Sequence, residues 1–109
     1  SALAGLTGMQ YLVLWENNIS DISPLVGLAD LKELNLSSNN ISDISPLAGL
    51  TNLHLLGLYD NNINNVSPLL ENGGLSEGDT VNFNVNPLSA ASVNVYIPQL
   101  QARGVNVVY

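Results

Sequence analysis

The feature that most constrains the fold of this chain is a repeat of 22 residues. Residues 17–28 and residues 39–50 are identical at eleven of twelve aligned positions, and a more divergent third copy begins at Asn61. A fixed period of this length indicates a solenoid. One copy cannot bury its apolar side alone, so the copies must stack to make a common core.

Each copy contains the pattern Leu-x-x-Leu-x-Leu-x-x-Asn-x-Ile, starting at Met9, Leu31, Leu53 and, in a degenerate form, Gly78. The Leu-x-Leu portion has a period of two, which predicts a short strand with alternate side chains pointing inward. Such strands stack in parallel about 4.8 Å apart. The last interval is lengthened by three residues, around residues 72–74.

An asparagine follows every predicted strand. A buried carboxamide has two donors and an acceptor oxygen, so it can satisfy backbone groups of its own turn and of a neighbouring turn. We therefore predict a structural asparagine ladder, formed by Asn17, Asn39, Asn61 and Asn86.

A Ser-Pro-Leu tripeptide at 23–25, 45–47 and 67–69 predicts a short helical turn on the convex side, with serine as N-cap and proline at the first helical position. Residues 86–109 differ from the repeats. Helical spacing there ends at Arg103-Gly104. Pro98 predicts a kink or two short helices, and residues 105–109 alternate like a final strand.

The repeat resembles the 22-residue leucine-rich repeat of bacterial internalin-like proteins. The motif Asn-x-Ile-Ser-Asp-Ile-Ser-Pro-Leu-x-x-Leu is matched at 17–28 and 39–50, and Tyr96-Ile97-Pro98 and residues 102–105 are similar to the C-terminal end of many such proteins. The resemblance implies an α/β leucine-rich-repeat solenoid, with a parallel concave sheet, short helical turns on the convex side and a C-terminal helical cap. It also implies binding through the concave sheet and a location outside the cell or on the bacterial cell surface.

We expect a single leucine-rich-repeat domain over 1–109. It would comprise the end of a preceding repeat (1–8), about four repeats (9–85) and a C-terminal cap (86–109). The alignment of residues 1–6 with 23–28 suggests a fragment that begins within a repeat. Its first strand would then be an uncovered edge, so we also expect a homodimer through the N-terminal end.

Composition excludes several partners. The formal net charge is −7 and the only Lys and Arg residues are Lys32 and Arg103, so nucleic acid and anionic membranes, which need basic patches, are not expected partners. Cysteine is absent, which excludes disulfides and thiolate chemistry. No run of about 18 apolar residues predicts membrane insertion.

The sequence offers little support for an enzyme or a metal site. The one histidine, His54, has no recurring acidic neighbour at the aligned positions. Asp21 and Asp43 occupy one repeat position, but Asn65 takes the third rung, which favours capping of the local backbone over calcium. We expect no enzymatic activity, no metal and no cofactor.

The outward strand positions are not dictated by the repeat, and exposed aromatic groups there are typical of a partner site. Trp15 and Tyr59 share one column two rungs apart, about 9–10 Å by strand spacing. The predicted function is therefore recognition of an unidentified partner protein. A structural spacer of a larger surface protein and a glycan-binding module remain alternatives. The predicted binding residues are Tyr11, Val13, Trp15, Glu33, Asn35, Ser37, Leu55, Tyr59 and Asp60.

Overall fold

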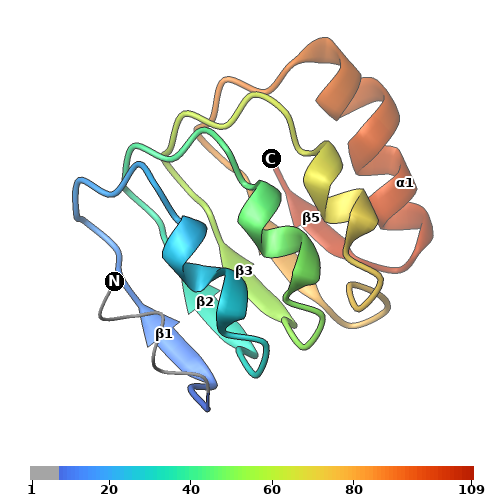
Figure 1. Ribbon diagram of the computed structural model, residues 1–109. Helices are drawn as coiled ribbons and strands as arrows, with labels where there is room; N and C mark the ends of the chain where they lie inside the picture. Colours follow the sequence, from blue (N-terminus) through green and yellow to red (C-terminus); the bar gives the residue numbers. More distant parts are fainter. Residues whose placement is uncertain (1–7) are drawn as a thin grey trace.

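Five short parallel strands form one sheet in a computed structural model that describes residues 8–109 (Figure 1). Each strand pairs with its neighbour in the sequence, so the chain coils in one direction and the solenoid is confirmed. The strands are β1 (Tyr11–Val13), β2 (Glu33–Asn35), β3 (Leu55–Gly57), β4 (Thr80–Asn82) and β5 (Asn106–Val108).

The middle residue of every strand faces the core. The register places Leu12, Leu34, Leu56, Val81 and Val107 opposite one another, and all five are buried. Because the repeats pair without slippage, every repeat position forms a column across the sheet. Residues on either side of the buried column point outward and form the concave face.

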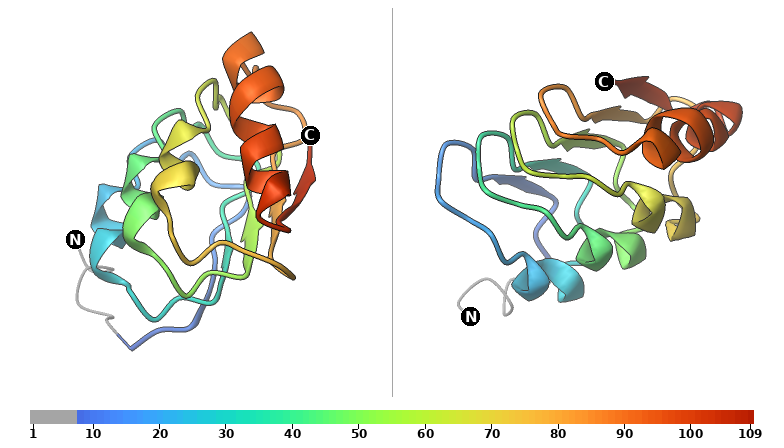
Figure 2. Two further views of the ribbon diagram at one scale, coloured as in Figure 1. Left: turned by 90° about the vertical axis from the view of Figure 1, so that its right-hand side faces the viewer. Right: turned by 90° about the horizontal axis from the view of Figure 1, so that it is seen from above.

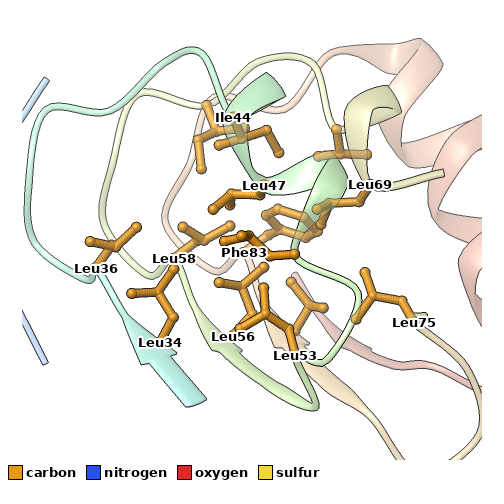
Figure 3. Close-up of a cluster of buried hydrophobic side chains, with 14 of the residues drawn as sticks. Leu34, Leu36, Ile44, Leu47, Leu53, Leu56, Leu58, Leu69, Leu75 and Phe83 are labelled. Carbon is orange, nitrogen blue, oxygen red and sulfur yellow. The ribbon is translucent and has the colours of Figure 1, made fainter. Parts of the chain in front are cut away.

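Short 3-10 helices lie on the side of the coil opposite the strands (Figure 2). They are η2 (Ser23–Gly27), η3 (Ser45–Gly49) and η4 (Ser67–Glu71). Each contributes one buried leucine, and Leu47 and Leu69 pack with Leu56 and Phe83 between the two sides (Figure 3). The apolar positions of the repeat therefore form one continuous core.

The residue that caps each helical turn is not the predicted serine. Serine is the first residue of each 3-10 helix and its side chain makes no capping bond. Instead, the aspartate or asparagine two residues before each serine accepts the backbone N–H of that serine at 2.9 Å. The pairs are Ser23 with Asp21, Ser45 with Asp43 and Ser67 with Asn65. Each aspartate thus caps the backbone of its own turn, and the uncharged Asn65 does the same in the third repeat.

These turns predict a specific acid sensitivity. Hydrogen bonds from the backbone and side chain of the following serine lower the pKa of Asp21 and of Asp43. The stabilisation from these hydrogen bonds is therefore complete above the pKa of an unfolded aspartate, about 3.9, and it is lost as the pH falls through the lower pKa values of the folded state.

Replacing both residues with asparagine rebuilds the turn found at Asn65, which does not titrate. We expect the double variant Asp21→Asn, Asp43→Asn to lose less stability in urea than the wild type between about pH 4 and 2. Parallel losses would contradict this account.

The ladder asparagines bond to two successive turns of the coil. Asn39 Oδ1 accepts from Ile19 N–H at 3.1 Å, and its Nδ2 donates to the carbonyls of Leu14, Leu36 and Ser37 at 2.9–3.2 Å. Asn61 and Asn86 make the equivalent bonds one and two turns further on. Asn17 differs, because it is exposed and donates to Leu14 and Trp15 of its own turn.

The residue before each of these asparagines has a left-handed backbone. The φ angles are 57° at Glu16, 58° at Ser38, 57° at Asp60 and 60° at Val85. This conformation turns the chain out of the strand and directs the next side chain inward. It is costly for residues with a Cβ, and most costly for a β-branched residue such as Val85.

Replacing Val85 should therefore stabilise the protein. Its side chain is 55 % exposed, so little packing is lost, and asparagine tolerates the left-handed region better than valine. We expect Val85→Asn to raise the free energy of unfolding by about 1 kcal/mol, which shifts Tm upward by about 4–8 °C. The control is Val95→Asn, at an exposed helical position that should show no gain. An unchanged Tm for Val85→Asn would argue against strain at this residue.

The C-terminal cap is a π-helical turn, η5 (Ser92–Tyr96), followed by α1 (Ile97–Ala102). Pro98 has no N–H to donate to the preceding turn, and the wider π turn lies next to it, where a kink was predicted. Gly104 reverses the chain with φ 92° and leads into β5. Arg103 donates to the carbonyls of Leu70 and Asn72, which ties the cap to η4.

Candidate functional site: the groove of the concave face

A groove of about 430 Å³ lies on the outward side of the sheet. Its floor is the backbone of the strands at Leu12, Leu34 and Leu56, whose side chains face the core, and its walls are the outward side chains of all five strands. This volume is within the usual range for ligand pockets. The groove residues are Tyr11, Leu12, Val13, Glu33, Leu34, Asn35, Ser37, Leu55, Leu56, Gly57, Thr80, Asn82 and Val108.

Two columns of side chains line the groove. The strand register places Tyr11, Glu33, Leu55 and Thr80 in the first column, and Val13, Asn35, Gly57, Asn82 and Val108 in the second. Tyr11, Val13, Leu55 and Val108 are 40–61 % exposed. Exposed apolar side chains thus lie at both ends of the groove and, at Leu55, on the central strand, while the amides of Asn35 and Asn82 lie on the strands on either side of β3.

Gly57 makes room in the second column for the side chain of Asn35 from the neighbouring strand. A Cβ at this position would lie 2.9 Å from Asn35 Oδ1 and 3.3 Å from Ser37 Oγ. The Asn35 carboxamide therefore leans toward the glycine, held by a 3.0 Å bond from Ser37 N–H to its Oδ1. Any larger residue at position 57 would displace this carboxamide and fill the groove.

The structure brings together six of the nine predicted binding residues in the groove: Tyr11, Val13, Glu33, Asn35, Ser37 and Leu55. Trp15, Tyr59 and Asp60 are exposed but lie beyond the ends of their strands, outside the groove lining. The sequence analysis did not include Gly57, Thr80, Asn82 and Val108 in the site. These four residues occupy outward-facing positions of β3, β4 and β5, and the alternation of side chains along each strand is the signal that would have identified them.

Other predicted features occupy other parts of the chain. His54 is exposed at the entrance to β3. Within residues 8–109, no three His, Cys, Asp or Glu side chains gather as a metal site would require. In the same range, no helix has the length and apolarity needed to span a membrane. The predicted homodimer through the N-terminal end would use the outer edge of β1 and the residues before it, of which 1–7 lie outside the described residues. The dimer stays a prediction.

Comparison with known proteins agrees with this architecture. The family described as "Leucine Rich repeats (2 copies)" matches residues 7–49 and again residues 30–72. Internalin C2 of Listeria monocytogenes strain 4b F2365 is 35 % identical with a TM-score of 0.79, over 98 % of this chain and 44 % of that protein. The internalin InlF of the same strain is 28 % identical with a TM-score of 0.81, over 98 % of this chain and 32 % of that protein.

A leucine-rich-repeat protein of Leptospira interrogans shares the fold, with a TM-score of 0.73 and 22 % identity over 98 % of this chain and 33 % of that protein. No curated protein sequence matches the chain. The chain thus spans less than half the length of the similar solved proteins. Leucine-rich-repeat domains generally mediate protein–protein interaction. The repeat period, the stacked parallel strands and the family match together show that this chain belongs to the leucine-rich-repeat family, with repeats of the bacterial internalin-like type.

Proposed function

We propose that the chain recognises a partner protein through the groove of its concave face. The observation that carries this proposal is the exposure of Tyr11, Val13 and Leu55 along one continuous groove. Desolvation of such side chains on binding is favourable, and aromatic residues at the centre of an interface contribute most. Trp15, Tyr59 and Asp60 lie beside the groove and would extend the contact area.

The proposal is for binding without catalysis, outside the cell or on the bacterial cell surface. The internalin-like type of the repeats supports both parts. A structural spacer would have no need of exposed apolar side chains in register across the sheet. A glycan-binding module is the second alternative, because Tyr11 and the amides of Asn35 and Asn82 line the same groove.

A matched pair of valines tests the proposal. Val13 lies in the groove and is 61 % exposed, whereas Val26 lies on the convex turn η2 and is 63 % exposed. The wild type, Val13→Lys and Val26→Lys would be immobilised and used to capture proteins from candidate lysates. We expect a partner that binds the wild type and Val26→Lys but is lost with Val13→Lys. A partner that Val13→Lys retains would contradict recognition through the groove, and complete absence of a partner would favour the spacer.

A further inference from the structure

We propose that the occupant of the groove is an extended segment of polyproline-II type that carries a lysine or arginine. This inference rests on the proposed function and specifies the chemistry of the partner. Three properties of the groove support it: a pair of free amide donors, the spacing between them, and the distribution of charge around them.

The free donors belong to Asn35 and Asn82. Asn35 Oδ1 accepts the N–H of Ser37 at 3.0 Å, and Asn82 Oδ1 accepts the N–H of Asn84 at 2.9 Å. These bonds fix the orientation of both carboxamides, since only the oxygen accepts a hydrogen bond from a backbone N–H. Each Nδ2 then lies on the opposite side of its carboxamide and, within residues 8–109, has no protein acceptor. Neither Nδ2 is a buried unsatisfied atom, so both are accessible and can donate to a ligand.

The spacing of these donors matches one periodicity of a polypeptide. Asn35 and Asn82 occupy the same column with Gly57 between them, so they are two strand spacings apart, or about 9.6 Å. Both make the same local bond, and their Nδ2 groups should be separated by a similar distance. In a polyproline-II segment, carbonyls three residues apart point the same way and lie about 9.3 Å apart. In an extended β-segment the equivalent carbonyls are about 6.8 Å apart, which does not fit both donors.

The polyproline-II conformation also suits the unpaired backbone of such a ligand. It has no internal hydrogen bonds, so its carbonyls are free to accept from the two amides. Gly57 adds no side chain of its own between the two amides, and the Asn35 carboxamide lies over it. Apolar side chains of the segment would contact Tyr11 and Leu55 on one side, and Val108 at one end.

Charge complementarity specifies the basic residue. Glu33 lines the groove directly, and the formal net charge of the chain is −7. Of the two basic residues, Arg103 is bonded to carbonyls of Leu70 and Asn72 on the helical side, away from the groove. The net negative charge favours encounter with a ligand that carries lysine or arginine, and Glu33, the one charged residue of the groove lining among the described residues, can orient the segment. The other basic residue, Lys32, is exposed next to Glu33 but does not line the groove.

Peptide carbonyls and sugar hydroxyls can both accept from the Nδ2 groups of Asn35 and Asn82. The spacing of the two donors matches the repeat of a polyproline-II segment, and this spacing favours a polypeptide over a glycan.

The test is a selection of random twelve-residue peptides displayed on phage against the wild-type protein. The selected peptides would then be synthesised and their Kd values measured by fluorescence anisotropy. We expect enriched sequences that contain proline and at least one lysine or arginine. They should bind about tenfold more weakly to Asn35→Asp and to Asn82→Asp. Each aspartate keeps the acceptor for the local backbone N–H, removes the free donor and adds one negative charge.

The added negative charge would by itself strengthen the binding of a basic peptide. Weaker binding can therefore be assigned to the loss of the Nδ2 donor. Asn84→Asp adds the same charge at a residue outside the groove lining and should not weaken binding. Peptides that are lost with Val13→Lys but tolerate both groove aspartates would overturn this inference and leave the proposed function standing. Peptides that tolerate Val13→Lys would overturn both. Enrichment of no peptide would also overturn the inference, and binding on a glycan array that is lost with Val13→Lys would assign the groove to sugars.

Discussion

Asn39→Ala is expected to lower the free energy of unfolding by about 3 kcal/mol, because it leaves backbone groups of two turns without partners. The carboxamide accepts from Ile19 N–H and donates to Leu14 and Leu36, and the bond to Leu36 is fully buried. No neighbouring strand lies beyond the strand end to take over these bonds, and the alanine side chain cannot replace them. The measurement is the urea midpoint and slope at neutral pH.

Asn40→Ala is the matched control for this prediction. Asn40 is the next residue in the chain and has the same side chain, but it is exposed and contributes a backbone N–H bond to Ile19 that alanine keeps. We expect a change within about 0.5 kcal/mol. Equal midpoints for the two variants would rule out the structural role of the ladder.

Gly74→Ala is the second substitution for which we expect a loss of about 3 kcal/mol or more. A Cβ at Gly74 would lie 1.8 Å from the carbonyl oxygen of Thr51 and 2.6 Å from its carbonyl carbon. Both atoms belong to the backbone, so one of the two loops must move. That movement would also disturb Asn72, whose Oδ1 accepts from Gly74 N–H and whose Nδ2 donates to the buried carbonyls of Leu47 and Leu50.

The adjacent glycine provides the control for the steric argument. A Cβ at Gly73 meets nothing within 4 Å, and its backbone is not in the left-handed region. Gly73→Ala should therefore be neutral or stabilising by up to about 1 kcal/mol, through the lower entropy of the unfolded chain. Thermal unfolding of the two single variants measures the difference. A similar Tm for both would show that the Thr51 loop moves aside at little cost.

The groove illustrates which parts of the site the sequence predicts. Alternation within Leu-x-Leu was enough to place Tyr11, Val13, Glu33, Asn35 and Leu55 on the outward face, because the side-chain period of a strand is two. The extent of the groove depended on contacts between repeats. Gly57 became important only because the Asn35 carboxamide leans over it from the neighbouring strand. Trp15 and Tyr59 are aromatic and exposed at the repeat position of Ser37, yet of these three residues only Ser37 lines the groove.

The sequence by itself determined the coil, the number of turns and the positions of the core residues, because a 22-residue period leaves only one way to bury the leucines of every copy. Only the tertiary structure decided the details that depend on distant backbone. The left-handed residues at Glu16, Ser38, Asp60 and Val85 have no common side-chain chemistry, and their conformation is set by the asparagine bonds that follow. The approach of Gly74 to Thr51 and the bridge from Arg103 to η4 likewise join residues more than 20 positions apart. A local pattern cannot specify such contacts, since they exist only after the turns have stacked.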